Sequence, residues 1–166
     1  MPGDAPAVET DPLDPHLPPY AGIAALESAV AEMPHGVVLR YGALYGPGTW
    51  YAPDGAIAKR VRAGVLREAP SWTSFVHADD AASAALAALD WPAGVVNIVD
   101  DERRPRPTGC PSTARRSARP LRAARKHAAA TGRPASNARA LSLGWKPRVA
   151  SWRTGFARMD VPVRTD

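Results

Sequence analysis

The stretch VVLRYGALYGPG, residues 37–48, decides the fold that the sequence predicts. Its first part, Val37–Tyr41, is a short apolar run rich in β-branched residues, which is typical of a buried parallel strand. Glycine and proline then recur through Gly48, so the strand is expected to open into a loop. Loops that follow parallel strands gather at one edge of the sheet, where α/β proteins bind ligands. Candidate binding residues are therefore sought at this edge.

Outward from this stretch, helical and strand-like segments alternate. Apolar residues recur at helical spacing in residues 20–33, which predicts a helix with Glu27 and Glu32 away from its apolar face. That face consists of Ile23, Leu26, Val30 and Met33. The further expected elements are a helix over 55–63, a strand over 72–76, a helix over 81–89 and a strand over 95–99. This alternation favours an α/β fold.

Charge divides the chain unevenly. Residues 1–102 hold 5 Lys or Arg against 14 Asp or Glu, whereas residues 103–159 hold 15 Lys or Arg and no carboxylate. Four regions follow: a disordered, Pro-rich acidic lead over 1–19, an α/β part over 20–102, a basic irregular segment over 103–132, and a closing helix and tail over 133–166.

Composition excludes several classes of protein. Cys110 is the single cysteine, so an internal disulfide is excluded and the cysteine content offers no metal-ligand spacing. No run approaches the roughly 20 apolar residues of a membrane span, and no signal peptide is visible, so a cytoplasmic protein is expected. The basic segment has no interleaved aromatics, which argues against specific nucleic-acid binding and leaves only nonspecific contact with polyanions.

Three motifs carry a family resemblance through their order and spacing. They are VLRYGALYGPG over 38–48, SFVHADDA over 74–81 and VNIVDD over 96–101. SNARALSLGW over 136–145 and SWRTGF over 151–156 follow them. Together they resemble the second half of an extended short-chain dehydrogenase/reductase of the NAD(P)-dependent epimerase/dehydratase type. The resemblance implies an α/β fold: a partial Rossmann-like parallel sheet with flanking helices, corresponding to the C-terminal portion of that family and lacking its Gly-rich nucleotide-binding half.

The resemblance also implies a function. Its members are oxidoreductases that use NAD or NADP, and they act on nucleotide sugars or similar small hydroxyl or carbonyl compounds. Carried onto this sequence, it places Tyr41 near the cofactor and Ala43, Tyr45, Gly46 and Trp50 near a small-molecule substrate. The residues alone leave other roles open. Tyr41 could close the top of a strand, Gly46 could serve turn geometry, and Trp50 could pack on a helix.

The sequence departs from the family where the chemistry takes place. No G-x-G-x-x-G occurs, and the Tyr-x-x-x-Lys pair is absent because Ala24 follows Tyr20 at the lysine position. No catalytic residue is therefore assigned, and we expect the chain alone to be inactive. Unpaired strand edges predict either self-association or docking of a missing N-terminal half. The alternative function is a non-catalytic binding module whose basic arm contacts polyanions.

Four further polar residues have two interpretations each. His77 could act as a general base, yet no Ser, Cys or second carboxylate is spaced to form a triad, so a hydrogen-bonded turn residue is favoured. Asp79 and Asp80 could bind a metal, but helix capping is the simpler account. Arg40, at the end of an apolar strand, could bind a substrate, but pairing with a carboxylate is favoured, and one of these aspartates is the candidate partner.

Overall fold

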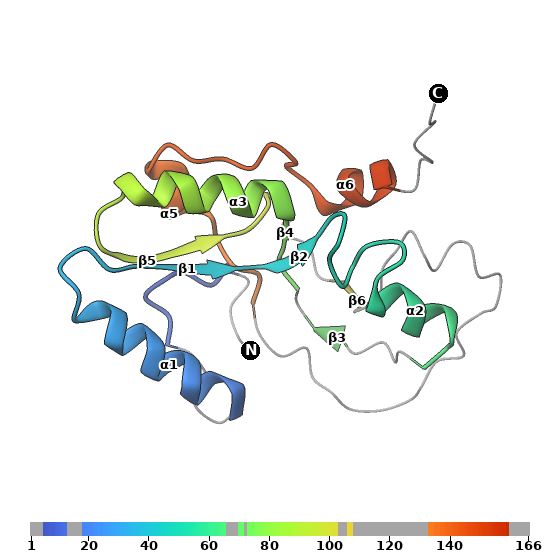
Figure 1. Ribbon diagram of the computed structural model, residues 1–166, viewed down its shortest axis with the longest axis horizontal. Coiled ribbons are helices and arrows are strands. Elements are labelled where there is room, and N and C mark those ends of the chain that lie inside the picture. Colours follow the sequence, from blue (N-terminus) through green and yellow to red (C-terminus); the bar gives the residue numbers. More distant parts are fainter. Residues whose placement is uncertain are drawn as a thin grey trace.

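The computed structural model describes residues 5–12, 18–65, 70–71, 73–102, 106–107 and 133–159 (Figure 1). Its helices are α1 (Pro18–Ala31), α2 (Ala56–Arg62), α3 (Ala78–Ala87), the 3-10 turn η1 (Ala88–Asp90), α5 (Ala138–Ser142) and α6 (Trp152–Met159). Its strands are β1 (Val37–Tyr41), β2 (Ala43–Tyr45), β3 (Pro70–Ser71), β4 (Phe75–His77), β5 (Gly94–Ile98) and β6 (Arg106–Pro107). Most of the expected basic segment, with Cys110, lies outside the described residues, as does Trp72, so those expectations stay predictions.

The central strands pair in parallel, as the apolar runs predict. β1 pairs with β5 from Val37 opposite Gly94 to Tyr41 opposite Ile98, and β2 pairs with β4. Short antiparallel pairing joins β3 to β6. The expected order of helix and strand is therefore confirmed through β5, but the loop expected after Tyr41 is corrected, because Ala43–Tyr45 form strand β2 by pairing with β4, and β3 is a further short strand.

Gly42 is the point where β4 enters the sheet. The Gly42 N–H donates to Ile98 O at 3.0 Å, and the next N–H, of Ala43, donates to Ser74 O at 2.8 Å. Two successive donors on one side break the alternation of a regular strand, so β4 lies between β2 and the continuation of β5. The Asp100 N–H closes the other side of β4 on Phe75 O at 2.7 Å. A Cβ at position 42 would stand 2.7 Å from Ser74 O, which explains the glycine.

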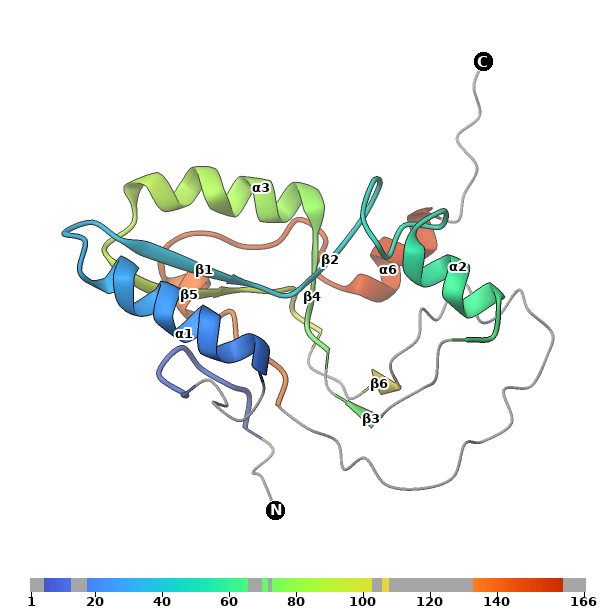
Figure 2. The same ribbon diagram turned by 60° about the horizontal axis from the view of Figure 1, so that its bottom comes forward.

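Helices cover both faces of β1 and β5. Both ribbon views show α3 on one face and α1 on the other (Figures 1 and 2). Val96 and Ile98 are two residues apart, so they point to the same face, where they are fully buried. They join a core cluster with residues of α3, α5 and the segments beside them, namely Val76, Ala81, Ala84, Ala140 and Trp145.

The helix α1 forms where periodicity predicts it but turns another face to the sheet. Arg40 of β1 donates from Nε and Nη2 to the two carboxylate oxygens of Glu27, at 2.8 and 2.7 Å. Glu27, which the sequence places away from the apolar face of the helix, therefore points to the sheet, and the expectation that Asp79 or Asp80 pairs with Arg40 is wrong. A half-buried guanidinium requires a carboxylate, and the bidentate pair orients the helix. The apolar Leu26 is left exposed as a consequence.

Part of the acidic lead has defined partners. Ala7 forms a parallel bridge with Ala135, and Asp11 pairs with Arg133. The Glu9 carboxylate accepts a hydrogen bond from the Asn97 N–H at 3.0 Å. Residues 5–12 therefore make defined contacts, although they belong to the segment 1–19 that was expected to be disordered. Their charged side chains and backbone groups pair with residues from distant parts of the sequence.

Within the described ranges, no helix is long and apolar enough to cross a membrane.

Candidate functional site

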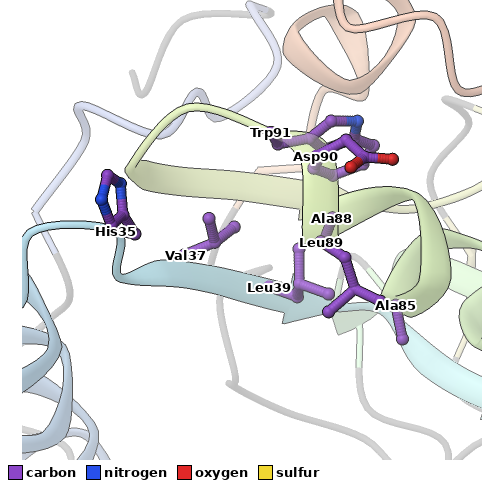
Figure 3. Close-up of a pocket in the computed structure, with 8 residues that line it drawn as sticks. All are labelled: His35, Val37, Leu39, Ala85, Ala88, Leu89, Asp90 and Trp91. Atoms are coloured by element: carbon purple, nitrogen blue, oxygen red, sulfur yellow. The ribbon is translucent and has the colours of Figure 1, made fainter.

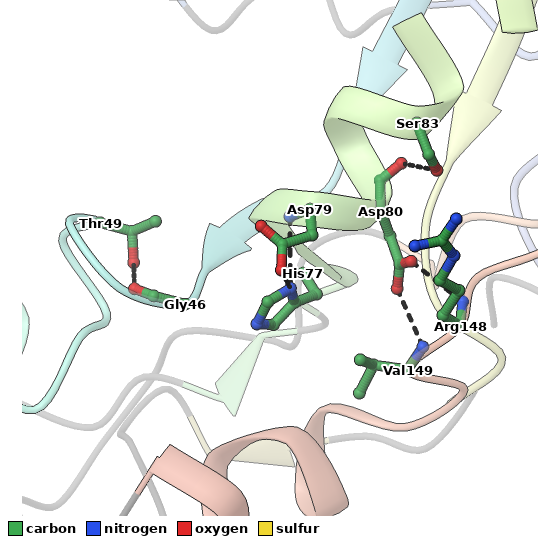
Figure 4. A network of polar contacts seen from close by, with 8 residues as sticks. All are labelled: Gly46, Thr49, His77, Asp79, Asp80, Ser83, Arg148 and Val149. Atoms are coloured by element: carbon green, nitrogen blue, oxygen red, sulfur yellow. Dashed lines mark hydrogen bonds and ion pairs between the residues drawn. The ribbon is translucent and has the colours of Figure 1, made fainter. Parts of the chain in front are cut away.

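The carboxyl ends of the parallel strands form the candidate site. β2 ends at Tyr45, β4 at His77 and β5 at Ile98, and the chain leaves each strand at the same edge because the strands are parallel. The loop after β2, the turn into α3 and the tail over 148–152 meet there (Figure 4).

The loop after β2 is a tight turn packed on an imidazole. Gly46 has a φ of 125° and Gly48 a φ of 74°, conformations that favour glycine. Thr49 Oγ1 donates to Gly46 O at 2.8 Å and closes the turn. A Cβ at position 46 would lie 3.1 Å from His77 Nε2, so the missing side chain permits this close approach.

His77 begins α3 rather than acting in a triad. Its Nδ1 accepts a hydrogen bond from the Asp79 N–H at 3.2 Å, which makes the ring the N-terminal cap of the helix. The Asp79 carboxylate lies 3.7 Å from Nδ1 and is largely exposed. The interpretation of His77 as a hydrogen-bonded turn residue is therefore confirmed.

Asp80 holds the tail of the chain against α3. Its side chain is buried, with 1% of the residue exposed, and accepts from the Arg148 N–H at 3.0 Å and the Val149 N–H at 2.9 Å (Figure 4). The prediction that Asp80 caps α3 is therefore wrong, because its carboxylate accepts hydrogen bonds from the backbone of another segment. Across the part of the chain that the structure describes, no group of three or more His, Cys, Asp or Glu is placed to hold a metal.

Asp100 makes a second buried clamp at the same edge. One oxygen accepts from the Trp152 N–H at 2.6 Å at the start of α6, and the other from the Glu102 N–H at 3.1 Å. Burial raises the pKa of this carboxyl to about 7, against the lowering effect of those two N–H groups. The sequence analysis missed this residue. Its signal is an aspartate directly after a buried strand, together with a helix whose first turn lacks an acid.

Tyr45 forms a buried wall of the site. The residue is 0% exposed, its ring stacks on Phe156 with centroids 4.8 Å apart, and it meets the His77 ring edge-on at 5.2 Å. A Cβ at Gly155 would lie 2.4 Å from its hydroxyl, which has no hydrogen-bond partner among the residues that the structure describes. Burial, and next the charge of Asp100, raises the pKa of this phenol.

The other expected site residues are spread along the edge. Tyr41 is partly exposed, and its hydroxyl donates to Ala81 O at 3.2 Å. Burial raises the pKa of its phenol. Ala43 packs on the aromatic cluster of Tyr45, whereas Trp50 stands in solvent with 75% of its surface exposed. The structure thus brings Ala43 and Tyr45 together with Gly46 but leaves Trp50 apart, and the cofactor and substrate roles of all five stay predictions.

Known proteins resemble this chain in sequence and in fold. A 3-diazoavenalumate denitrifying reductase from a Streptomyces species is 43% identical over 166 residues, which cover 84% of this chain and 55% of the reductase. Among solved structures, UDP-glucose 4-epimerase of Thermus thermophilus in complex with NAD has a TM-score of 0.63 and 24% identity over 98% of this chain and 60% of its own. The Bordetella bronchiseptica enzyme WbmG in complex with NAD and UDP has a TM-score of 0.65 and 21% identity over 92% and 52%.

The fold is Rossmann-like. The parallel strands and flanking helices match these structures, which confirms the expected fold class as a partial fold of this kind. The chain spans about half the length of the reductase that it matches. No family model matches the sequence.

The two helices that begin at this edge, α3 and α6, have capped N-termini. In Rossmann folds, the pyrophosphate lies on free backbone N–H groups of a helix N-terminus that follows a Gly-rich turn. Here the His77 ring caps the N-terminus of α3, and the Asp100 carboxylate caps that of α6. The chain also contains no G-x-G-x-x-G. Neither α3 nor α6 therefore offers free N-terminal N–H groups of this kind to the phosphates of NAD.

Proposed function

We propose that this chain is the C-terminal, substrate-side part of an NAD(P)-dependent oxidoreductase of the epimerase/dehydratase type. The observation that carries the proposal is 43% identity to a reductase, on a fold whose solved neighbours are complexes with NAD. The motifs that resemble this family end the parallel strands at a single edge, where a substrate would meet a cofactor.

The chain would contribute binding surface rather than proton transfer. Tyr41 presents partly exposed aromatic surface at this edge, and the turn at Gly46 shapes the loop that leads on to the exposed Trp50. The substrate would be a small hydroxyl or carbonyl compound, with nucleotide sugars as one class. Neither buried carboxylate is available for catalysis, because Asp80 and Asp100 accept main-chain hydrogen bonds. By itself the chain would be inactive.

Cofactor titration tests this proposal. Calorimetry of the chain alone with NAD, NADH, NADP and NADPH should show no saturation. The same titration is then repeated with the part of the Streptomyces reductase that this chain does not match, hereafter the complementing part. Saturable binding of one cofactor pair, exceeding that of the complementing part alone, is the expected result. Equal binding with and without this chain would contradict the proposal.

A further inference from the structure

The outer edge of β1 has unused backbone groups. The hydrogen bonds from Gly94 N to Gly36 O and from Gly42 N to Ile98 O show that even-numbered residues of this strand face β5. Because strand residues alternate, the N–H and C=O groups of Val37, Leu39 and Tyr41 point to the opposite edge. In the described part of the chain, no strand pairs with that edge.

The edge of β5 that faces away from β1 is differently placed. There the Asn97 N–H already donates to the Glu9 carboxylate at 3.0 Å. A charged side chain on an edge blocks the addition of another strand. An additional strand could therefore pair with the outer edge of β1 but not with this edge of β5.

A hollow lies beside this open edge. Its volume is about 450 Å³, and we call it the β1 hollow (Figure 3). It is lined by His35, Val37, Leu39, Ala85, Ala88, Leu89, Asp90 and Trp91. Figure 3 shows Val37 and Leu39 on β1 pointing toward Leu89 of η1, the turn that follows α3. Leu89 is 81% exposed, so the hollow presents apolar surface next to the open edge of β1.

We propose that the outer edge of β1 and the β1 hollow form a docking surface for a parallel strand from the nucleotide-binding half of a Rossmann sheet. This inference rests on the proposed function. Backbone groups of β1 would supply the ladder, and an apolar side chain of the added strand would fill the hollow.

Two observations specify this occupant rather than another strand. First, α1 leads directly into β1, and in α/β sheets a helix of this kind returns from a parallel strand that usually neighbours the next one. Second, the chain matches only 55% of the reductase and 52% of WbmG, and it has no Gly-rich turn of its own. The nucleotide-binding half is therefore expected in the unmatched portion of these proteins.

Two leucines provide a matched test. Leu89 lines the β1 hollow, whereas Leu86 on the same helical segment is 71% exposed and does not line it. Leu89→Lys removes apolar burial and places a charge in the interface, so affinity for the tagged complementing part should fall by at least about tenfold. Leu86→Lys should leave that affinity unchanged. Circular dichroism of both variants checks that they fold alike.

A backbone variant tests the strand pairing separately. Leu39→Pro removes an N–H that points outward and leaves the donors toward β5 in place, so it should weaken the same association. Equal affinity of the wild type, Leu89→Lys and Leu39→Pro would overturn the docking surface. A dimer of the chain alone that Leu89→Lys abolishes would also overturn it, because the occupant would then be a second copy.

The failure of this inference can be told from failure of the proposed function. If the two parts associate through Leu89 but bind no cofactor, the docking surface stands and the proposed function fails. If the mixture binds a cofactor and Leu89→Lys does not weaken association, the proposed function stands and the docking surface is wrong.

Discussion

A single buried carboxyl should dominate the pH dependence of stability. Burial raises the pKa of Asp100 to about 7, so the folded chain binds this proton more tightly than the unfolded chain, whose aspartate pKa is about 3.9. The stabilisation is complete below about pH 4 and is lost as the pH rises through 7. Urea unfolding at pH 5 and pH 8 should therefore give a lower free energy of unfolding at pH 8.

The variant Asp100→Asn should reduce that difference, because its amide oxygen still accepts from Trp152 N–H without titrating. Asp54→Asn, in an exposed loop, should keep the wild-type dependence. An unchanged slope in Asp100→Asn would show that another group controls it.

Among the helices, replacing two glycines with alanine should change the stability of the chain in opposite directions. In α6, a Cβ at Gly155 would stand 2.4 Å from the Tyr45 ring and hydroxyl, which are buried and cannot move aside. Gly155→Ala should destabilise the chain by about 1–3 kcal/mol, the usual cost of overpacking. In α1, Gly22 has nothing within 4 Å, so Gly22→Ala should stabilise by up to about 1 kcal/mol through helix propensity. Thermal unfolding of both variants shows whether each substitution raises or lowers stability. Stabilisation by Gly155→Ala would contradict the close packing of Gly155 on Tyr45.

The elements themselves could be predicted from the sequence, but their long-range polar contacts could not. Apolar period and β-branching predict β1, β5 and the core of α3, because these are local properties. The face that α1 presents depends on the ion pair of Glu27 with Arg40, which no local pattern shows. Asp80 likewise accepts hydrogen bonds from backbone groups 68 and 69 positions away, and a backbone donor leaves no trace in a side-chain pattern. The sequence therefore predicts at which edge of the sheet the candidate site lies, but not the contacts that its residues make.

At the scale of the whole molecule, two of the apolar regions that the described residues expose should behave differently. Besides the β1 hollow, α1 exposes Ile23 and Leu26 because its ion pair turns Glu27 to the sheet, and Met33 is exposed just after the helix. Leu26 is 60% exposed, and apolar groups of this kind are typical of association sites. We expect the chain alone to associate with rising concentration through α1 and not through the β1 hollow.

Sedimentation velocity over a range of concentrations measures this association. Leu26→Lys should shift the distribution toward monomer, since it replaces exposed apolar surface with charge. Leu89→Lys should leave the distribution unchanged if the β1 hollow awaits a different partner. A wild-type chain that stays monomeric at all concentrations and melts cooperatively would refute the association. If Leu26→Lys changes self-association and Leu89→Lys does not, the two surfaces act independently of each other. The exposed face of α1 would then bind a second copy of the chain, and the edge of β1 would bind a different partner.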